Sequence, residues 1–375
     1  MNPSPEFKPH DGAAPGMDQS RHVWRDTRSC AVLGMGRALP GKAVSTTHLL
    51  AHLHRQYGVD VRRSGGVAAR RLGIEARHIC RDFVERREPP RAGHGNAELA
   101  ARALQSALQE AGLRSNDLSF LIGHTATPGQ PLPPNITRVA ELIGYDGPFV
   151  ELRQACTGFA NALIMARGLL DAPHSGPVAI VGSETGSVFF DPLRAAEDHA
   201  QLVNLLQMGD GAAACVVGRG APGHGAQFSH IYFGQIGRER RAGFELKAAG
   251  SNHAAAAARE VPEFEHDFGA VREHGPLLFE QGIAAATSMG IDMQQVDYLI
   301  PHQANGHMAK LLAPRIGVDA SRIFVNADRL GNTGSAAIWL ALTELRTRLR
   351  HGERVLVLGA EATKHMFGGM LYVHG

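Results

Sequence analysis

A cysteine at the start of a helical pattern is the residue in this chain best suited to covalent chemistry. Cys156 follows a short apolar run at 149–152 and precedes a helical pattern that continues to Leu170. The free N–H groups and the macrodipole of a helix N-terminus stabilise a thiolate, and the same N–H groups can bind an oxyanion. The sequence therefore predicts that Cys156 is a nucleophile with a lowered pKa.

Two polar residues in the second half of the chain could assist such a nucleophile. His302 follows the apolar run 296–300, and Asn332 opens a helical pattern. A neutral imidazole and an amide can both donate hydrogen bonds to an oxygen on which negative charge develops. Taken singly, His302 is typical of a strand end and Asn332 of a helix N-cap, so the chemistry depends on whether the fold unites them.

An internal repeat gives a reason to expect that it does. A Gly-Ser-Glu ends 28 residues after Cys156, and a Gly-Ala-Glu ends 29 residues after Asn332. His124 precedes Cys156 by 32 residues, and His302 precedes Asn332 by 30. Two halves with one plan would pack as a pseudo-symmetric pair, and their equivalent loops would meet around one cavity. We interpret His124 itself as a loop histidine near a dimer contact.

The remaining pattern is α/β. Strands are expected at 29–36, 118–123, 149–152, 178–182, 212–218, 296–300, 323–325, 354–359 and 370–373, and helices at 46–57, 96–112, 136–143, 160–170, 277–289 and 332–345, with Asn96 as a helix cap. The expected organisation is a disordered tail over 1–28, a first half over 29–218, a linker over 219–230 and a second half over 231–375.

Composition indicates a reduced protein without a nucleic-acid partner or a metal. The 375 residues are 44% hydrophobic and carry a net charge of +2 with no long basic block. The four cysteines lack CxxC spacing, and the 20 histidines are dispersed. No apolar stretch reaches the roughly 20 residues of a membrane span, and the tail lacks the apolar core of a secretory signal. We expect a cytoplasmic protein.

Three motifs, taken in order, resemble those of the β-ketoacyl-acyl carrier protein synthase III family. They are Ala-Cys-Thr-Gly-Phe at 155–159, Pro-His-Gln-Ala-Asn at 301–305 and Gly-Asn-Thr-Gly-Ser at 331–335, supported by Gly-Asp-Gly at 209–211 and Phe-Gly-Gly at 367–369. The resemblance covers roughly residues 29–375. It implies a thiolase-like fold, in which two pseudo-symmetric βαβαβαββ-type halves form a five-layer αβαβα arrangement.

The resemblance also implies a two-step acyl transfer. Cys156 would take an acyl group from a thioester, and His302 and Asn332 would then assist decarboxylation of a malonyl extender, whose carbanion attacks the acyl-cysteine. Backbone N–H groups of Cys156 and Gly369 would form the oxyanion hole. Coenzyme A or phosphopantetheine thioesters, including acyl carrier protein, would be substrates. No cofactor is implied, and the strand before Cys156 would pair across the two-fold axis of a homodimer.

Several positions depart from the family pattern. His307 stands where many members carry an arginine for docking the carrier protein, and no tryptophan near Arg71 matches the one that stacks the adenine of coenzyme A. Leu132 falls where a bulky pocket-lining residue of the partner subunit often lies, so a larger acyl chain could be admitted. Together with Asn305 in the histidine motif, these residues are candidates for contacts with substrate or pantetheine.

These departures, with long segments at 81–95 and 190–207, resemble a specialised branch of the family that serves polyketide, alkylresorcinol or quinolone pathways. Two other functions stay open. The acyl-cysteine could deliver its group to an alcohol, an amine or a second acyl chain without malonyl. Alternatively, the chain could be a non-catalytic subunit of a ketosynthase heterodimer. A papain-like protease also uses Cys, His and Asn, but the duplicated plan does not match that fold.

Overall fold

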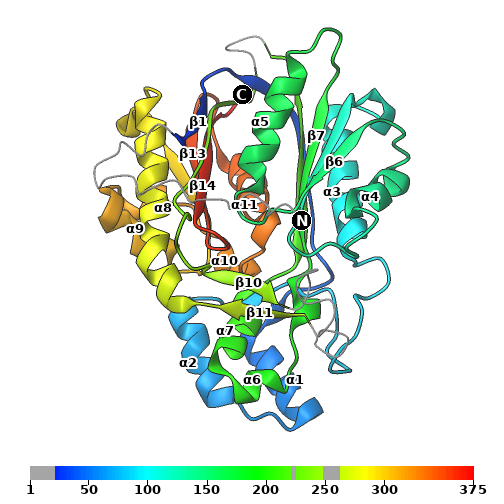
Figure 1. The fold of residues 1–375 in the computed structure, drawn as a ribbon, viewed down its shortest axis with the longest axis vertical. Helices are drawn as coiled ribbons and strands as arrows, with labels where there is room; N and C mark the ends of the chain where they lie inside the picture. Colours follow the sequence, from blue (N-terminus) through cyan, green and yellow to red (C-terminus); the bar gives the residue numbers. More distant parts are fainter. Residues whose placement is uncertain (1–21, 221–224, 248–261) are drawn as a thin grey trace, which may run out of the picture.

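The centre of the protein is a ten-stranded mixed sheet (Figure 1). The computed structural model describes residues 22–220, 225–247 and 262–375. The strands are β1 (Trp24–Asp26), β2 (Cys30–Ala38), β3 (Val44–Ser45), β4 (Ala76–Arg77), β5 (Phe120–His124), β6 (Phe149–Leu152), β7 (Val178–Glu184), β8 (Gly211–Gly218), β9 (Gln227–Gln235), β10 (Phe244–Lys247), β11 (Glu263–His266), β12 (Tyr298–Pro301), β13 (Arg354–Glu361) and β14 (Met366–Val373). The central sheet runs β12-β13-β14-β9-β2-β8-β7-β5-β6, and β1 pairs with β9.

This sheet consists of two matching halves, joined where Cys30 and Ala31 of β2 pair with Phe228 and Gln227 of β9. In the first half, β7 pairs in parallel with β5 and antiparallel with β8. In the second half, β13 pairs in parallel with β12 and antiparallel with β14. The duplication that the motif spacing indicates is therefore present in the strand topology.

Helices lie outside and between the two halves. They are α1 (Thr46–Tyr57), α2 (Arg62–Leu72), α3 (Asn96–Ala111), α4 (Asn135–Ile143), α5 (Gly158–Leu170), α6 (Arg194–Glu197), α7 (His199–Gln207), α8 (Phe268–Ser288), α9 (Met308–Ile316), α10 (Ala327–Leu330) and α11 (Ala337–Leu345). The predicted bounds of α1 are met, because Ser45 caps its first turn and Gly58 ends it in the left-handed conformation.

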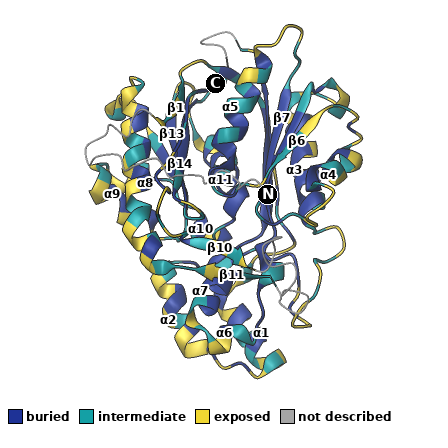
Figure 2. Cartoon of the chain, in the orientation of Figure 1, coloured by how far each residue is buried: buried dark blue, intermediate teal, exposed yellow. Residues whose placement is uncertain are grey.

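The two central helices explain the five layers. α5 contacts β5 and β7 of the first half and β9 and β14 of the second, while α11 contacts β2, β8 and β12. Every residue of α11 from 337 to 342 is buried, as expected for a helix that is apolar on all sides. α3 covers the outer face of the first half and α8 that of the second (Figures 1 and 2). The predicted thiolase-like αβαβα arrangement is confirmed.

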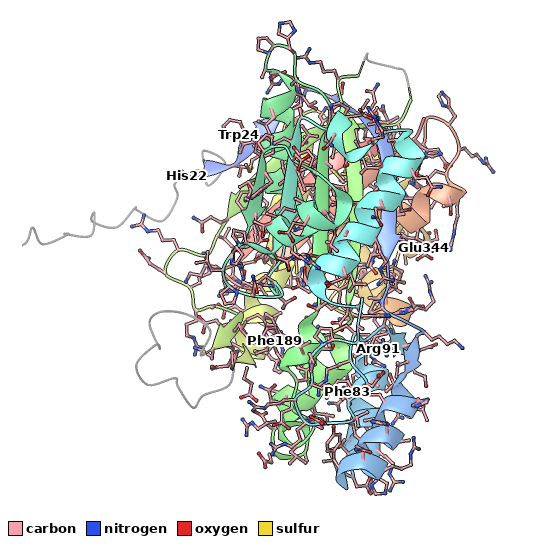
Figure 3. All side chains as sticks on the ribbon, turned by 90° about the vertical axis from the view of Figure 1, so that its right-hand side faces the viewer. His22, Trp24, Phe83, Arg91, Phe189 and Glu344 are labelled. Carbon is pink, nitrogen blue, oxygen red and sulfur yellow. The ribbon has the colours of Figure 1, made fainter. Side chains whose placement is uncertain are left out.

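A smaller helical lobe lies at one end of these layers (Figure 1). α1, α2, α6 and α7 pack with the β10–β11 hairpin around an apolar cluster that includes Leu53, Leu206 and Phe264. Phe83 and Phe189, labelled in Figure 3, belong to this lobe, and the Phe189 ring meets that of Phe264 edge to face at 5.4 Å. The segment 190–207, which looked like an insertion, supplies α6 and α7.

The structure corrects several predicted boundaries. Residues 24–26 were placed in the tail 1–28 but pair with β9, while residues 1–21 lie outside the described part of the chain. The linker predicted at 219–230 is shorter, because β9 begins at Gln227. The helix predicted at 277–289 begins at Phe268 and continues through Pro276, so proline there does not mark its start.

Asn96 is the first residue of α3 and not its cap, which is Gly95. Its buried amide instead donates to the Thr127 carbonyl at 2.7 Å and to the Thr125 hydroxyl at 3.1 Å. Among the described residues, no helix is long and apolar enough to cross a membrane.

Candidate active site

Cys156 lies in the turn between β6, the strand at the edge of the first half-sheet, and the central helix α5. The next residue, Thr157, donates its N–H and its hydroxyl to Oε2 of Glu361 at 2.9 and 2.7 Å. Gly158 allows this turn to lie close to the core, because a Cβ there would stand 2.5 Å from Nδ1 of His124. The turn that carries Cys156 is therefore fixed on both sides.

The thiol of Cys156 does not have the lowered pKa that its place at a helix start predicts. Burial raises the pKa of the Cys156 thiol well above the ordinary value, and the carboxylates of Glu361 and Glu184 raise it further. A helix terminus contributes only about 0.3–1 kcal/mol in exposed positions, and here the burial and the two carboxylates outweigh it. The resting group is a neutral thiol.

His302 follows β12 and is a buried, uncharged imidazole. Its backbone N–H donates to the Leu358 carbonyl of β13 at 2.7 Å. Burial lowers the pKa of His302 to about 4, so the ring is neutral near pH 7. Its Nδ1 has no hydrogen-bond partner within the described residues. The ring therefore retains hydrogen-bonding capacity for a bound molecule.

The residue after His302 holds the histidine loop. Oε1 of Gln303 accepts the N–H groups of Asn326 and Ala327 at 2.7 and 3.0 Å, and its Nε2 donates to the Phe324 carbonyl at 3.0 Å. This side chain thereby anchors the histidine loop to the segment that leads into α10.

Asn332 precedes the 3-10 turn at 334–336 that leads into α11, so it is not the N-cap of that helix and the predicted helix start at 332 is too early. Its Oδ1 accepts the Gly334 N–H at 3.1 Å, which leaves Nδ2 as the donor of the side chain. Its backbone pairs with the end of α7: the Asn332 N–H donates to the Gln207 carbonyl at 2.8 Å, and its carbonyl accepts the Gly209 N–H at 3.0 Å. Asn332 is thus fixed by the helical lobe as well as by its own turn.

Hydrogen bonds join the turns of Asn332 and Cys156. Ser335 donates its N–H and hydroxyl to Oε2 of Glu184 at 3.0 and 2.8 Å. The same hydroxyl lies 3.3 Å from the carbonyl oxygen of Gln154, two residues before Cys156. The start of the second-half helix is therefore held against the nucleophile turn of the first half.

His302 reaches the same region through β13. It is bonded to Leu358, three residues before Glu361, and Glu361 binds Thr157 next to Cys156. The fold therefore gathers the turns of Cys156, His302 and Asn332 at neighbouring ends of strands and helices, as the repeat predicts.

The neighbour of the proposed oxyanion glycine, Gly368, lies beside the nucleophile helix. Gly369 is buried in β14, next to Gly368. A Cβ on Gly368 would stand 2.7 Å from the Cβ of Ala160 in the first turn of α5. The Phe-Gly-Gly motif therefore lets β14 approach the helix that follows Cys156.

Three other residues, which the sequence predicts to contact substrate or pantetheine, lie near the end of α2: Arg71, Asn305 and His307. The His307 N–H donates to Oδ1 of Asn305 at 2.9 Å, and Nε2 of His307 lies 3.0 Å from the Arg70 carbonyl oxygen. Arg71 is the exposed neighbour of Arg70. The Gly306 N–H adds a bond of 2.8 Å to the carbonyl of Leu72. The turn after His302 is therefore docked on the helical lobe.

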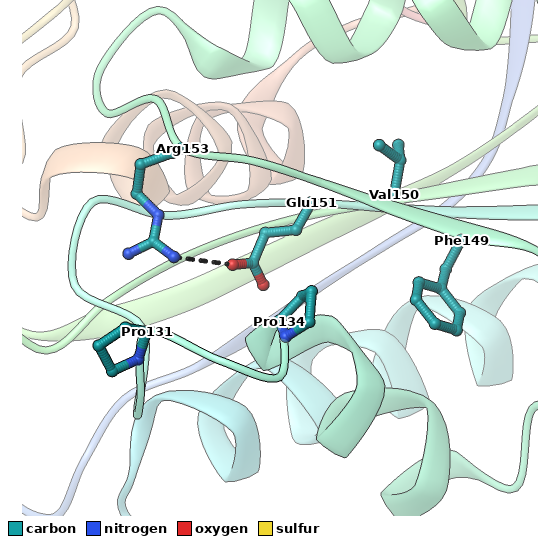
Figure 4. A pocket seen from close by; sticks show the side chains of 6 residues that line it. All are labelled: Pro131, Pro134, Phe149, Val150, Glu151 and Arg153. Atoms are coloured by element: carbon teal, nitrogen blue, oxygen red, sulfur yellow. Dashed lines mark hydrogen bonds and ion pairs between the residues drawn. The ribbon is translucent and has the colours of Figure 1, made fainter. Parts of the chain in front are cut away.

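Leu132 lies apart from this group, on an exposed loop beside β6. It is 81% exposed, and Phe149 of β6 is 41% exposed. Nearby, a depression of about 370 Å³ is lined by Pro131, Pro134, Phe149, Val150, Glu151 and Arg153 (Figure 4). The ion pair of Arg153 with Glu151, at 3.3 Å, crosses it.

His124, the repeat mate of His302, is a core residue and not the loop histidine that we expected. Nε1 of Trp339 donates to its Nε2 at 3.0 Å, and burial lowers the pKa of His124 to about 3. The equivalent position thus has a scaffold role in one half and faces the candidate site in the other.

Sequence reasoning missed the residues that hold the site together. Glu361 had a usable signal, because it occupies the repeat position of Glu184. Gln303 lies inside the histidine motif, where attention to the loop would have found it. Gln207 carried no signal, because its partners at 304 and 332 become neighbours only in the fold. Within the described ranges, no His, Cys, Asp and Glu side chains form a group of three able to hold a metal ion.

Two pseudo-symmetric half-sheets around two buried helices define a thiolase-superfamily protein, and comparison with known proteins narrows the class. Residues 150–237 match the family described as 3-oxoacyl-[acyl-carrier-protein (ACP)] synthase III, and residues 286–371 match its C-terminal family. The β-ketoacyl-[acyl-carrier-protein] synthase III of Rhodospirillum centenum is 26% identical over 341 residues, covering 87% of this chain and 93% of that protein. The Rubrobacter xylanophilus enzyme of that name is 29% identical over 340 residues, covering 88% and 93%.

Comparison with solved structures points to the same family of condensing enzymes. AbyA1, a tetronic acid condensing enzyme, has a TM-score of 0.79 at 27% identity, covering 92% of this chain and 99% of that one. The FabH synthase III of Pseudomonas aeruginosa has a TM-score of 0.76 at 25% identity, covering 92% and 98%. The family models, the curated relatives and these structures all relate the chain to the β-ketoacyl-acyl carrier protein synthase III family, whose members named here are condensing acyltransferases.

Proposed function

We propose that this enzyme joins an acyl group to a malonyl-type thioester by decarboxylative Claisen condensation. In the first step, Sγ of Cys156 attacks the carbonyl carbon of an acyl thioester, and the bond to the carrier sulfur breaks. The thiol proton passes to the departing sulfur, so the carrier leaves as a free thiol. Backbone N–H groups of Cys156 and Gly369 would stabilise the tetrahedral oxyanion.

In the second step, a malonyl thioester loses carbon dioxide. The electron pair of the broken carbon–carbon bond forms an enolate, whose oxygen accepts hydrogen bonds from His302 and Asn332. The enolate carbon attacks the acyl carbonyl, Cys156 departs as a thiolate and takes a proton from water, and a β-ketoacyl thioester is released. Because thiolate is a good leaving group, both steps suit cysteine.

The neutrality of His302 supports this proposal most strongly. A charged imidazolium would attract the malonyl carboxylate and stabilise the state before decarboxylation. The buried ring, with a pKa of about 4, instead offers a hydrogen bond without a charge. It therefore favours the enolate over the carboxylate.

Mass spectrometry of the intact protein tests both steps. The enzyme is incubated with a series of acyl-CoA and acyl-carrier-protein thioesters, and a malonyl thioester is then added. We expect an acyl adduct that Cys156→Ala abolishes, and one carbon dioxide released for each product formed. An acyl-enzyme that turns over without carbon dioxide would exclude condensation on malonyl.

A second function is transfer of the acyl group to an alcohol, an amine or another acyl chain. Two observations favour it: His307 binds the Arg70 carbonyl where a docking arginine is common in the family, and Leu132 is exposed. The neighbour AbyA1 is itself a tetronic acid condensing enzyme. Release of an O- or N-acyl product from the acyl-enzyme without malonyl would support this function, and strict dependence on malonyl would exclude it.

A third function, a non-catalytic subunit of a heterodimer, requires a purely structural thiol. A cerulenin-like or acyl-CoA probe distinguishes it, because a structural thiol would not be labelled.

The substrates that we propose for the enzyme are thioesters of coenzyme A or phosphopantetheine, with no additional cofactor.

We also propose that the protein forms a homodimer through β6. This strand is the last in the sheet order, and an edge strand presents unpaired backbone groups to another chain. A second copy would cover Phe149 and the depression beside it. In this arrangement Leu132 would lie near the partner subunit.

A further inference from the structure

Gln207, the last residue of α7, touches both of the turns that carry the second-half site residues. Its carbonyl accepts the Asn332 N–H at 2.8 Å. Its side-chain Nε2 donates to the Ala304 carbonyl at 2.6 Å, two residues after His302. The residue is only 6% exposed. One residue of the helical lobe thus spans the His302 loop and the Asn332 turn.

Close backbone approach makes this span rigid. Met208 and Asn332 form a parallel bridge. A Cβ on Gly209 would lie 2.0 Å from the Leu330 carbonyl oxygen, and a Cβ on Gly331 would lie 2.8 Å from the Gln207 carbonyl oxygen. Both glycines are therefore needed for the two backbones to meet, and Gln207 is held at the contact.

The hydrogen bond to Ala304 is short and directional. Because its partner is a carbonyl oxygen, the Gln207 amide must present its NH₂ group there. The Ala304 carbonyl is half-buried, so loss of its donor leaves it only partly compensated by water, and the loop would move to recover a partner. Gln303 anchors the same loop to the 324–327 segment, but only Gln207, among the described contacts, ties it toward Asn332.

We infer that Gln207 is a positioning residue that sets the separation of His302 and Asn332 for enolate stabilisation. The inference rests on the proposed condensation. Two donors must meet one enolate oxygen at about 2.7–3.1 Å, and a displacement of about 1 Å can cost a factor of about 10² in rate. Acyl loading depends on Cys156, whose turn is held by Glu361 and not by Gln207. Loss of Gln207 should therefore slow decarboxylation and spare loading.

A matched control lies on the same helix. Gln201 is also buried, at 8% exposure, and its Nε2 donates to the Phe264 carbonyl of β11 at 2.7 Å. Gln201→Met removes the same kind of bond from the same helix without touching the site. It reports how much of any effect comes from loosening the helical lobe.

The first experiment compares Gln207→Met with Gln201→Met in the full-length enzyme. Acyl loading is followed by intact mass, and decarboxylation by carbon dioxide release from malonyl thioester on preloaded enzyme. For Gln207→Met we expect loading within about threefold of wild type and decarboxylation slower by about 10- to 100-fold. Gln201→Met should leave both rates within about threefold. Equal losses in both variants, or no selective loss in Gln207→Met, would overturn the inference.

The second experiment uses pH to restore the lost donor. Gln207→Glu keeps the shape, but its ionised carboxylate would face the Ala304 carbonyl oxygen. When protonated, the same group can donate an O–H to that oxygen, and burial raises the pKa of such a carboxyl. We expect decarboxylation by Gln207→Glu to recover at least about tenfold between pH 8 and pH 5.5, while the wild-type rate stays flat. A purely structural role predicts no such recovery.

The positioning role of Gln207 can still be tested if the proposed condensation proves wrong. If wild type forms acyl-Cys156 but releases no carbon dioxide, amide hydrogen exchange of residues 302–307 becomes the readout. Faster exchange in Gln207→Met than in Gln201→Met would support the positioning role, and equal exchange would overturn it.

Discussion

Glu361, the last residue of β13, accepts both the N–H and the hydroxyl of Thr157, the residue after Cys156. The other half contains the counterpart: Glu184, the last residue of β7, accepts the N–H and hydroxyl of Ser335. Each half thus ends a central strand with a carboxylate that holds a helix start of the opposite half. This exchange fixes the two turns relative to each other and places two negative charges near the nucleophile.

Removal of one of these charges should make Cys156 more reactive. In Glu361→Gln the side chain keeps its shape but loses the charge that raises the pKa of the Cys156 thiol. A decrease of roughly half to one pKa unit would increase the thiolate fraction, and hence the iodoacetamide alkylation rate near pH 7.5, about three- to tenfold. The rate is measured by mass spectrometry of the Cys156 peptide.

The matched control is Glu280→Gln, because Glu280 is an exposed carboxylate on α8 that pairs with Arg315. Its rate should equal that of wild type. An unchanged rate in Glu361→Gln would mean that the carboxylate does not control the thiol.

The alkylation rate of Cys156 in the wild type should rise with pH throughout the range 6–9. Because the folded pKa lies well above the ordinary value, the thiol is protonated below it, and each pH unit increases the thiolate fraction about tenfold. A plateau below pH 8 would show that the thiol is activated in the free protein, as the helix N-terminus alone predicts.

The rate of decarboxylation, in contrast, should not depend on pH in the neutral range. His302, with a pKa of about 4, is neutral above pH 5 and becomes charged only as the pH falls through that value. For enzyme already loaded with acyl groups, we expect a flat decarboxylation rate from pH 5.5 to 8, measured as carbon dioxide release. An inflection near pH 6.5, the ordinary histidine value, would contradict a desolvated His302.

Replacing two glycines of α5 by alanine, one at a time, distinguishes the effect of close packing at the site from the effect of helix propensity on stability. Gly158→Ala would put a methyl group 2.5 Å from the His124 ring, and overpacking of this kind costs about 1–3 kcal/mol in unfolding free energy. Gly168→Ala, in the same helix, meets no atom within 4 Å and should stabilise by about 0.5–1 kcal/mol. Denaturant unfolding of both variants measures these changes, and equal effects would refute the close contact.

The sequence predicted the convergence of the site because the repeat carries geometric information. Similar spacings in the two halves predict equivalent places for Cys156 and Asn332, each just before a helical segment, and the fold brings these turns together through Ser335 and Gln154. The roles of Cys156, His302 and Asn332 in catalysis stay predictions until the acyl-enzyme is measured. Local signals were equally sufficient for α1, where a serine cap and a left-handed glycine set both ends.

Properties that depend on distant partners could not be predicted. The helix start at Cys156 indicated a lowered thiol pKa, but the carboxylate of Glu361, bound to Thr157 across 204 positions, acts in the other direction. Likewise, the partner of the Gln207 side chain is 97 residues away. β1 was missed because a three-residue strand has almost no local pattern and is stabilised by pairing with β9.

The edge strand β6 gives the last prediction. Phe149 is 41% exposed on this strand, next to the depression that Pro131 and Pro134 line. If a second copy pairs with β6, Phe149→Asp would bury a charge in the interface, at a cost of several kcal/mol. We expect wild type to sediment as a dimer and the variant as a monomer at micromolar concentration. The control Leu311→Asp replaces an exposed leucine on α9 and should stay dimeric. A dimer that survives Phe149→Asp, or a monomeric wild type, would exclude pairing through β6.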